Sequence, residues 1–318
     1  MAYNYDWCTS WYVESFTRNK DDTGIQAKCS SEPGSASTDQ ASSLRVVITG
    51  STKGIGLAMA ECFLSAGDRV LITSRSACAV DAAVDDFSGR FGDECVYGMA
   101  CNVGDTGQVE NLAAFARERL GGVDLWINNA GSNGYLYANL VDFPAEALAE
   151  IVSTNVLGSL LCSRAAIKLM MNQPGGGHVF NMEGAGSDGN PTSKYAAYGF
   201  SKAGMIQLAK SLATETKDLP VGVHTLSPGP VITELVASGQ FAFGKIGRIL
   251  LNTIAETPEA VAEDLVPKLR DFTFKPGTTK SAKAIRFLTP DKAVKKFYAR
   301  LVKGENKNRF FLEDAPEK

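Results

Sequence analysis

Two residues in the string YGFSK have the types and spacing of an acid–base pair. Tyr198 and Lys202 lie four residues apart within YAAYGFSKAGMIQLAKSLATE, whose apolar spacing predicts a helix. This spacing places both side chains on one face of the helix. A phenol with an ordinary pKa near 10 becomes an acid–base group at neutral pH when a neighbouring cation stabilises the phenolate. We therefore expect these two side chains to act together in proton transfer.

A glycine-rich loop, TGSTKGIG, directly follows the first predicted strand. A nucleotide pyrophosphate needs close approach of the backbone and a helix N-terminus pointing at its charge, and glycine at this density allows both. The loop therefore predicts a dinucleotide site. The residues expected to bind are Gly50, Ser51, Thr52, Lys53, Gly54, Ile55 and Gly56.

The second predicted strand ends in Ser74, Arg75 and Ser76, without a carboxylate. Sites that prefer NAD usually carry an acid here for the ribose 2′-hydroxyl, whereas a guanidinium suits a 2′-phosphate. Lys53 adds a second cation near the same ribose. We therefore expect NADPH as the cofactor, with NADH used more weakly. The alternative interpretation is that Lys53 and Arg75 are ordinary solvated charges.

Small and amide residues close the next two predicted strands. Asn102 and Val103 follow the third strand, where adenine is expected, and Asn129, Ala130 and Gly131 follow the fourth. Such residues leave room for a cofactor to lie flat across the strand ends.

The elements that must position these residues alternate along the chain. Short β-branched runs are followed by longer stretches with helical apolar spacing, which is typical of βαβ units. Residues 44–290 therefore predict one α/β domain, a doubly wound parallel sheet (Rossmann fold) with helices on both faces and a C-terminal lid and extension. The predicted strands are LRVVIT, DRVLITS, ECVYGMAC, VDLWIN, GHVFNM, VGVHTLS and a late one in KAIRFL.

Three segments depart from this alternation. Residues 1–43 lack a sustained period and predict disorder; a transit-peptide remnant and residues added to the natural chain are both open interpretations. Residues 235–275 predict either a substrate lid or packing helices. Residues 291–318 predict a basic amphipathic helix and tail, whose apolar stripe either packs on the core or contacts an anionic membrane surface. The stripe consists of Val294, Phe297, Tyr298, Leu301 and Val302.

Composition excludes several classes of function. The chain has 32 basic and 35 acidic side chains and a net charge of −3, which excludes a nucleic-acid binder by bulk charge. No uninterrupted apolar run approaches the roughly 18 residues that span a bilayer, so any membrane contact is expected to be peripheral. Seven cysteines without a CxxC pair argue against a disulfide framework or a zinc site. His178 and His224 lie in predicted strands and are expected to be structural.

The order and spacing of TGSTKGIG, NNAG, Asn155, YGFSK and SPGPVITEL resemble the short-chain dehydrogenase/reductase family over residues 44–235. The resemblance implies strand order 3-2-1-4-5-6-7, with Tyr198 as proton donor to a carbonyl. It also implies that Lys202 holds the nicotinamide ribose and lowers the pKa of Tyr198, while Asn155 helps a water connect the lysine to solvent. By itself, Asn155 is equally well explained as a helix cap or a coincidence. The residues implied to contact the nicotinamide carboxamide are Pro228, Gly229 and Thr233, and Val231 in the same turn is expected to bind the cofactor.

A narrower resemblance is to the chlorophyll b reductases of plants and green algae, in their smaller, non-membrane-spanning type. GGHVFNMEGAGSDGNPT, TIAETPEAVAEDLVPKLR and KAIRFLTP carry it. It implies NADPH-dependent reduction of the 7-formyl group of chlorophyll(ide) b to 7-hydroxymethyl. It further implies a chloroplast location on the stromal side of the thylakoid, a peripheral membrane contact, and a homo-oligomer or a complex with a related membrane-bound reductase.

Two other functions stay open on the sequence. One is a generic short-chain reductase of a lipophilic ketone or ketoacyl substrate, and the other is a non-catalytic NADPH-binding scaffold. If the substrate is a pigment, Phe241, Phe243 and Ile246 are expected to contact it, although core packing explains them equally well.

One position departs from the family pattern. The usual catalytic serine would fall at Gly184 or Ala185, and neither residue carries a hydroxyl. Ser187 is the nearest substitute, and an ordinary loop serine is the alternative interpretation.

Overall fold

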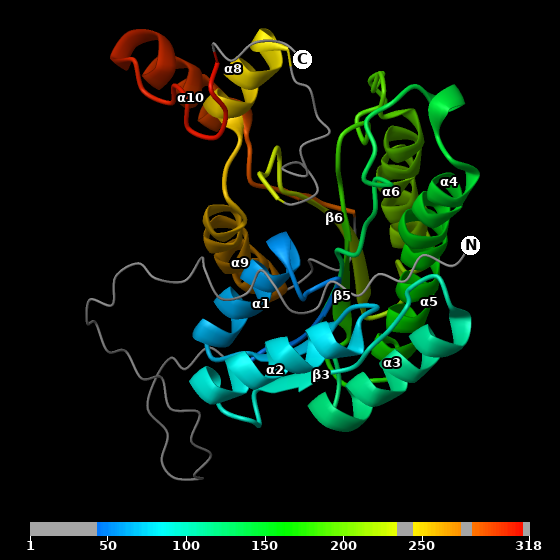
Figure 1. The fold of residues 1–318 in the computed structure, drawn as a ribbon. Helices are drawn as coiled ribbons and strands as arrows, with labels where there is room; N and C mark the ends of the chain where they lie inside the picture. The colour runs from blue at the N-terminus through cyan, green and yellow to red at the C-terminus, as the bar shows by residue number, and fades with distance from the viewer. Residues whose placement is uncertain (1–42, 234–243, 275–281, 314–318) are drawn as a thin grey trace.

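Seven parallel strands form one sheet in the order β3-β2-β1-β4-β5-β6-β7 (Figure 1). The computed structural model describes residues 43–233, 244–274 and 282–313, so the predictions for residues 1–42, Phe241 and Phe243 lie outside the described residues. Every predicted strand is present, which confirms the predicted fold class. The strands are β1 Arg45–Thr49, β2 Arg69–Thr73, β3 Val96–Gly98, β4 Leu125–Asn128, β5 Gly177–Met182, β6 Val221–Ser227 and β7 Ala284–Arg286.

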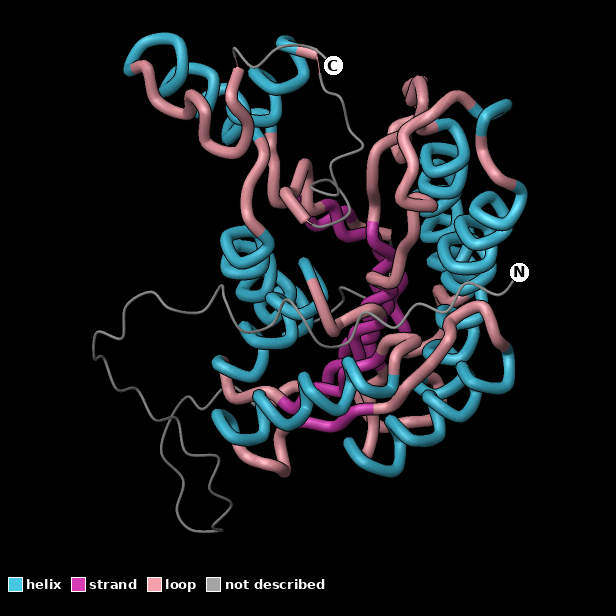
Figure 2. Tube along the Cα trace, in the orientation of Figure 1, coloured by secondary structure: helices cyan, strands magenta, loops and turns pink. Residues whose placement is uncertain are grey.

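Helices cover both faces of the sheet, as Figure 2 shows. The side chains of β1 alternate between the two faces: Val46 and Ile48 join one apolar core and Val47 joins the other. Helices α1, α2 and α9 contribute to the first core, and α3, α5 and α6 to the second. The helices are α1 Gly54–Ser65, α2 Ala77–Phe91, α3 Thr106–Leu120, α4 Ala145–Ile151, α5 Gly158–Met170, α6 Ala196–Glu215, α8 Lys245–Ile254, α9 Pro258–Phe274 and α10 Pro290–Lys303, with short turns η1 Leu140–Asp142 and η2 Val152–Leu157.

The continuous helical stretch Ala145–Met170, made of α4, η2 and α5, is long and apolar enough to cross a bilayer by length and composition alone. Its α5 part packs on α3 and β5 and buries Cys162, Ala166 and Met170 in the second core. We therefore assign it to the helical layer of the domain.

Helices α8 and α10 lie beside each other, away from the sheet (Figure 1). Helices α8 and α10 thus form a lobe apart from the core, whereas α9 and β7 belong to the domain. The predicted residues His178 and His224 lie side by side in the core, with 3.1 Å between Nδ1 and Nε2. Burial lowers the pKa of His178 to about 4, so His178 is neutral at physiological pH, and the position of both residues in the core supports a structural role.

Candidate active site

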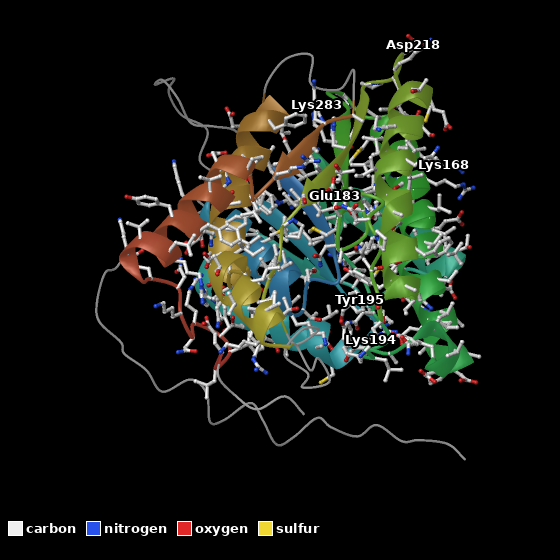
Figure 3. All side chains as sticks on the ribbon, turned by 90° about the horizontal axis from the view of Figure 1, so that it is seen from above. Lys168, Glu183, Lys194, Tyr195, Asp218 and Lys283 are labelled. Atoms are coloured by element: carbon white, nitrogen blue, oxygen red, sulfur yellow. The ribbon has the colours of Figure 1, made fainter. Side chains whose placement is uncertain are left out.

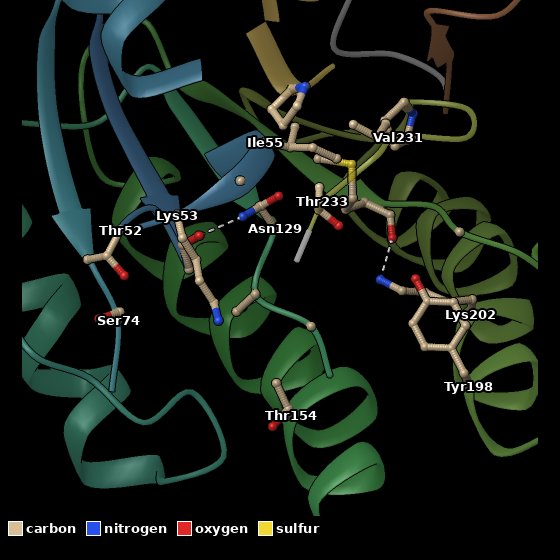
Figure 4. A pocket seen from close by; sticks show the side chains of 18 of the residues that line it. Thr52, Lys53, Ile55, Ser74, Asn129, Thr154, Tyr198, Lys202, Val231 and Thr233 are labelled. Atoms are coloured by element: carbon tan, nitrogen blue, oxygen red, sulfur yellow. Dashed lines mark hydrogen bonds between the residues drawn. The ribbon is translucent and has the colours of Figure 1, made fainter. Parts of the chain in front are cut away.

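A cavity of about 820 Å³ opens at the carboxyl ends of the central strands (Figure 4). Its size suits a ligand, and open α/β sheets bind ligands at this edge. The structure brings together here all the residues predicted to bind the cofactor except Ser51, Gly56 and Asn102. Those that line the cavity are Gly50, Thr52, Lys53, Gly54, Ile55, Ser74, Arg75, Ser76, Val103, Asn129, Ala130, Gly131, Tyr198, Lys202, Pro228, Gly229, Val231 and Thr233.

The backbone of the glycine loop borders the cavity. Gly50 and Gly54 have φ values of +65° and +57°, which residues with a Cβ rarely adopt. A Cβ on Gly50 would lie 2.9 Å from the Cα of Ala130, and the amide of Asn129 donates to the Gly50 carbonyl at 2.9 Å. Lys53, the N-cap of α1, makes no side-chain capping bond. The first turn of α1 therefore offers its backbone N–H groups, and the positive end of the helix dipole, to an anion.

Ser51, Gly56 and Asn102 support this loop and its neighbours and do not line the cavity, so their contact with the cofactor stays a prediction. The Ser51 hydroxyl is buried and bonds to the backbone of β1 and β2. A Cβ on Gly56 would lie 2.5 Å from the amide nitrogen of Asn129. The Asn102 carboxamide oxygen accepts from the Gly104 N–H at 3.1 Å and closes a turn.

Two cations line the cavity where the ribose of a cofactor was expected. Arg75 is exposed and pairs with Glu150 at 3.0 Å. The Nζ of Lys53 lies 5.6 Å from the ring centroid of Tyr135. An exposed ion pair contributes little free energy, so Arg75 can exchange Glu150 for a phosphate at small cost.

Tyr198 and Lys202 project from α6 into the cavity, as predicted (Figure 4). Lys202 is 4% exposed, and its Nζ donates to the Met182 carbonyl at 3.0 Å and lies 5.8 Å from the centroid of the Tyr198 ring. Burial lowers the pKa of Lys202 to about 8.

Burial also raises the pKa of Tyr198, and Tyr195 adds to the rise. The lowering implied by the family resemblance is thus not seen in the protein alone, because burial removes water from the phenol and disfavours the phenolate. At neutral pH Tyr198 is a protonated phenol, which is the form that donates a proton.

Gly184 faces the phenol. A Cβ at this position would lie 2.5 Å from the Tyr198 hydroxyl oxygen and 3.1 Å from the Cγ of Lys202. The phenol therefore occupies the space that a side chain at residue 184 would need. Gly184 stands closest to the place predicted for the usual serine, and it presents no hydroxyl.

Ser187 does not line the cavity in this structure, and its catalytic role stays a prediction. Its buried hydroxyl donates to the Lys202 carbonyl at 3.1 Å and accepts from the Gly184 N–H at 3.0 Å. Both bonds are internal, and Ser187 is not among the residues that line the cavity. The serine therefore fixes the loop that carries Gly184 against α6.

Asn155 has a structural use that the sequence did not reveal. It lies on the π-helical turn η2, and such turns are frequent at functional sites. Its buried amide exchanges two hydrogen bonds of 2.8 Å with the backbone of Ser132 and donates to the Ser201 hydroxyl at 2.8 Å. Asn155 thus links the segment after β4 to Ser201 on α6, the residue before Lys202.

The sequence analysis did not predict two tyrosines that line the cavity, which we call the aromatic wall. Tyr135 and Tyr195 line the cavity, and the rings of Tyr195 and Tyr198 lie 4.7 Å apart. Asn133 donates to the Tyr195 hydroxyl at 2.6 Å, and Tyr135 has a φ of +54°, a strained value typical of functional sites. The only signal in the sequence was the position of these tyrosines just after NNAG and just before YGFSK.

Ile246, predicted to contact substrate, is instead 83% exposed on α8 and does not line the cavity, because α8 lies away from the strand ends. Glu183 was also missed. It is 7% exposed and lines the cavity, and its Oε1 makes no hydrogen bond within the described part of the chain.

The chain resembles curated proteins over most of its length. It is 47% identical over 274 residues to chlorophyll(ide) b reductase NOL of Oryza sativa subsp. japonica, covering 85% of this chain and 78% of that protein. It is 46% identical to the Arabidopsis thaliana NOL protein over 85% of this chain and 77% of the relative. It is 43% identical to the probable chlorophyll(ide) b reductase NYC1 of Arabidopsis thaliana, over 77% of this chain and 50% of that protein.

Solved structures show the same fold. An actinorhodin polyketide ketoreductase variant, solved with NADPH, has a TM-score of 0.65 and 24% identity, covering 77% of this chain and 95% of that one. A 3-ketoacyl-(acyl-carrier-protein) reductase of Brucella melitensis, complexed with NADH, has a TM-score of 0.65 and 23% identity, over 78% and 97% of the two chains. Residues 45–240 match the short chain dehydrogenase family, so the chain belongs to this family of oxidoreductases.

Proposed function

We propose that this protein is a chlorophyll(ide) b reductase, which reduces the 7-formyl group of chlorophyll(ide) b to 7-hydroxymethyl with NADPH. The observation that supports this best is a cavity lined by both Tyr198 and Lys202, in a chain that is 47% identical, over 85% of its length, to a protein of that name. A mere cofactor-binding scaffold has no use for a phenol and a buried lysine that face one cavity.

The cavity fits a nicotinamide dinucleotide. The uncapped start of α1 and the glycine backbone suit the pyrophosphate, while Lys202, Gly229 and Thr233 line the cavity toward the catalytic end. When bound, the reduced nicotinamide supplies the hydride. Lys53 and Arg75 support a preference for NADPH, because both are cations that line the expected ribose end and a 2′-phosphate is an anion.

Tyr198 donates the proton to the formyl oxygen. Its raised pKa keeps the phenol protonated before the reaction. Lys202, held by the Met182 carbonyl, places a positive charge near the phenol and stabilises the phenolate left after donation. Asn155 and Ser187 are positioning residues that fix the backbone around this pair.

We also assign substrate contacts to the aromatic wall of the cavity. A pigment macrocycle is flat and apolar, so it stacks on tyrosine rings in preference to polar groups. Tyr135 and Tyr195 line the cavity, and the Tyr195 ring lies 4.7 Å from that of Tyr198. The bond from Asn133 fixes the hydroxyl of Tyr195. We assign these two rings to substrate.

The location and the partners are also proposals. The relatives are named chloroplastic, and we assign this chain to the chloroplast, on the stromal side of the thylakoid. Exposed apolar side chains on η2, α5 and α6 suit a homo-oligomer or a complex with a related membrane-bound reductase, because an apolar patch of this kind marks an interface. They are Val152, Leu157, Leu160 and Phe200.

The test is a substrate panel with purified protein and NADPH. Chlorophyllide b and a ketoacyl thioester are supplied in parallel, and products are separated by chromatography. We expect the 7-hydroxymethyl pigment from chlorophyllide b and slow turnover of the thioester. Brisk reduction of the thioester without conversion of the pigment would move the assignment to a generic reductase, and cofactor binding with neither product would support a scaffold.

A further inference from the structure

Glu183 is a buried acid that lines the cavity at the end of β5. Its side chain is 7% exposed, and Figure 3 shows it in the interior of the molecule. The backbone is fixed at this point, because the Glu183 N–H donates to the Leu226 carbonyl of β6 at 2.8 Å. Its Oε1, however, makes no hydrogen bond to any described residue. A buried carboxylate oxygen without a donor is unfavourable in the protein alone, which points to a positive charge supplied by a ligand of the cavity.

The two sequence neighbours of Glu183 both contact the Tyr198–Lys202 pair. The Met182 carbonyl accepts from the Lys202 Nζ at 3.0 Å. A Cβ on Gly184 would lie 2.5 Å from the Tyr198 hydroxyl oxygen. Because consecutive Cα atoms lie about 3.8 Å apart, the Cα of Glu183 lies within about 8 Å of that oxygen. Glu183 therefore belongs to the reacting end of the cavity.

Reduction of the formyl group creates a positive charge at this end of the cavity. The hydride leaves C4 of the dihydronicotinamide with its electron pair and bonds to the formyl carbon, while the formyl oxygen takes the proton of Tyr198. The formyl group is thereby reduced to an alcohol, and the nicotinamide is oxidised to a cation. Since the reacting atoms must be in contact, the nicotinamide ring has to lie close to the formyl group that Tyr198 protonates.

The charged side chains of the cavity act on that cation in opposite ways. Lys202 stabilises the phenolate of Tyr198 but repels a second positive charge beside it. Two acids are among the described residues that line the cavity. Glu259 is exposed, so water and salt screen its charge, whereas Glu183 is buried and is screened much less. Glu183 is therefore the acid that can offset Lys202.

We propose that the Glu183 carboxylate is the countercharge of the oxidised nicotinamide, and that it favours hydride donation by stabilising the positive charge that develops on the ring. The inference rests on the proposed function for the reaction itself. Glu183 acts through its charge, as a fixed group that stabilises charge formed during the reaction. Two unit charges about 8 Å apart near a protein surface change an equilibrium constant roughly tenfold or more.

The test compares the affinities of the purified protein for NADP+ and for NADPH, each measured by isothermal titration calorimetry without pigment. Glu183→Gln keeps the size of the side chain and removes its charge, so it should raise the Kd for NADP+ about tenfold relative to the Kd for NADPH. Glu183→Ser is a second neutral variant with a smaller side chain and should behave alike, whereas Glu183→Asp retains the charge and should keep most of the wild-type ratio. The matched control is Glu215→Gln, which removes the same charge at the exposed last residue of α6 and should leave the ratio unchanged.

The second readout is a single turnover of chlorophyllide b, in which Glu183→Gln should transfer the hydride about tenfold more slowly than wild type. A neutral variant with the wild-type affinity ratio or the wild-type rate of transfer would overturn the proposal. Equal loss of affinity for both cofactor forms would overturn it as well, because it would assign Glu183 a structural role only. The affinity ratio is measured without pigment, so wild-type protein that leaves chlorophyllide b unreacted would refute the proposed function without deciding the role of Glu183.

Discussion

A side chain at residue 184 should displace the catalytic phenol. Gly184→Ala adds one methyl group, and the Cβ would lie 2.5 Å from the Tyr198 hydroxyl oxygen, where about 3.4 Å is an ordinary contact. The phenol must therefore retreat by about 0.9 Å. A misplacement of about 1 Å can cost about a hundredfold in rate, equivalent to about 2.7 kcal/mol of barrier. Gly184→Ser, which restores the hydroxyl usual in the family, should suffer the same loss.

The assay follows pigment reduction at saturating NADPH, with cofactor affinity measured separately by the fluorescence of bound NADPH. We expect kcat to fall about a hundredfold in Gly184→Ala while cofactor affinity changes little, because the glycine loop is untouched. Gly204→Ala is the matched control, since a Cβ at this exposed position of α6 meets nothing within 4 Å. A Gly184→Ala enzyme within about threefold of wild type would refute the placement of Tyr198.

Three further predictions rest on charges. Arg75→Ala should reduce the preference for NADPH over NADH roughly tenfold or more, because a hydrogen bond between charged groups contributes about 1.5–3 kcal/mol. Equal catalytic efficiency of the wild type with both cofactors would count against the proposal. The rate of pigment reduction should fall above about pH 8, where Lys202 loses its proton, and a profile that stays flat through pH 9 would contradict this role. Arg300 lowers the pKa of Glu313 to about 2, so the stabilising pair is complete above the ordinary Glu pKa and is lost as pH falls toward 2. Glu313→Gln should therefore lower Tm at neutral pH by about 2–4 °C and flatten its decline in acid, as followed by circular dichroism.

Much of the fold follows from local patterns in the chain. Buried strands such as β1 and β4 are short β-branched or apolar runs, and the alternation with helical spacing predicts a parallel sheet. The order of the strands came from the family resemblance, because spacing alone does not say which strands pair. The glycine loop, Tyr198 and Lys202 were found because their chemistry depends on neighbours within a few residues.

Some predicted site residues do not line the cavity, because their positions depend on contacts that spacing along the chain does not encode. Ser51 and Gly56 belong to the loop but support it, since the turn directs them away from the cavity. Ser187 was placed by distance along the chain, whereas its hydroxyl bonds to the Lys202 carbonyl on α6. For α10 the amphipathic pattern was predicted, but the pattern left open whether its apolar stripe packs on the core. The stripe is exposed, because the basic face of the helix pairs with Asp264 and Glu313.

The proton-donor role of Tyr198 is tested most directly by Tyr198→Phe with NADPH and chlorophyllide b. The phenylalanine ring keeps the stacking on Tyr195 and removes only the hydroxyl. Product is followed by chromatography over several enzyme equivalents of pigment, and NADPH binding is titrated on the same sample. We expect wild-type protein to form the 7-hydroxymethyl pigment, and Tyr198→Phe to bind NADPH normally and form it at least about a hundredfold more slowly. Formation of that product by Tyr198→Phe at a rate near that of wild type would contradict the account.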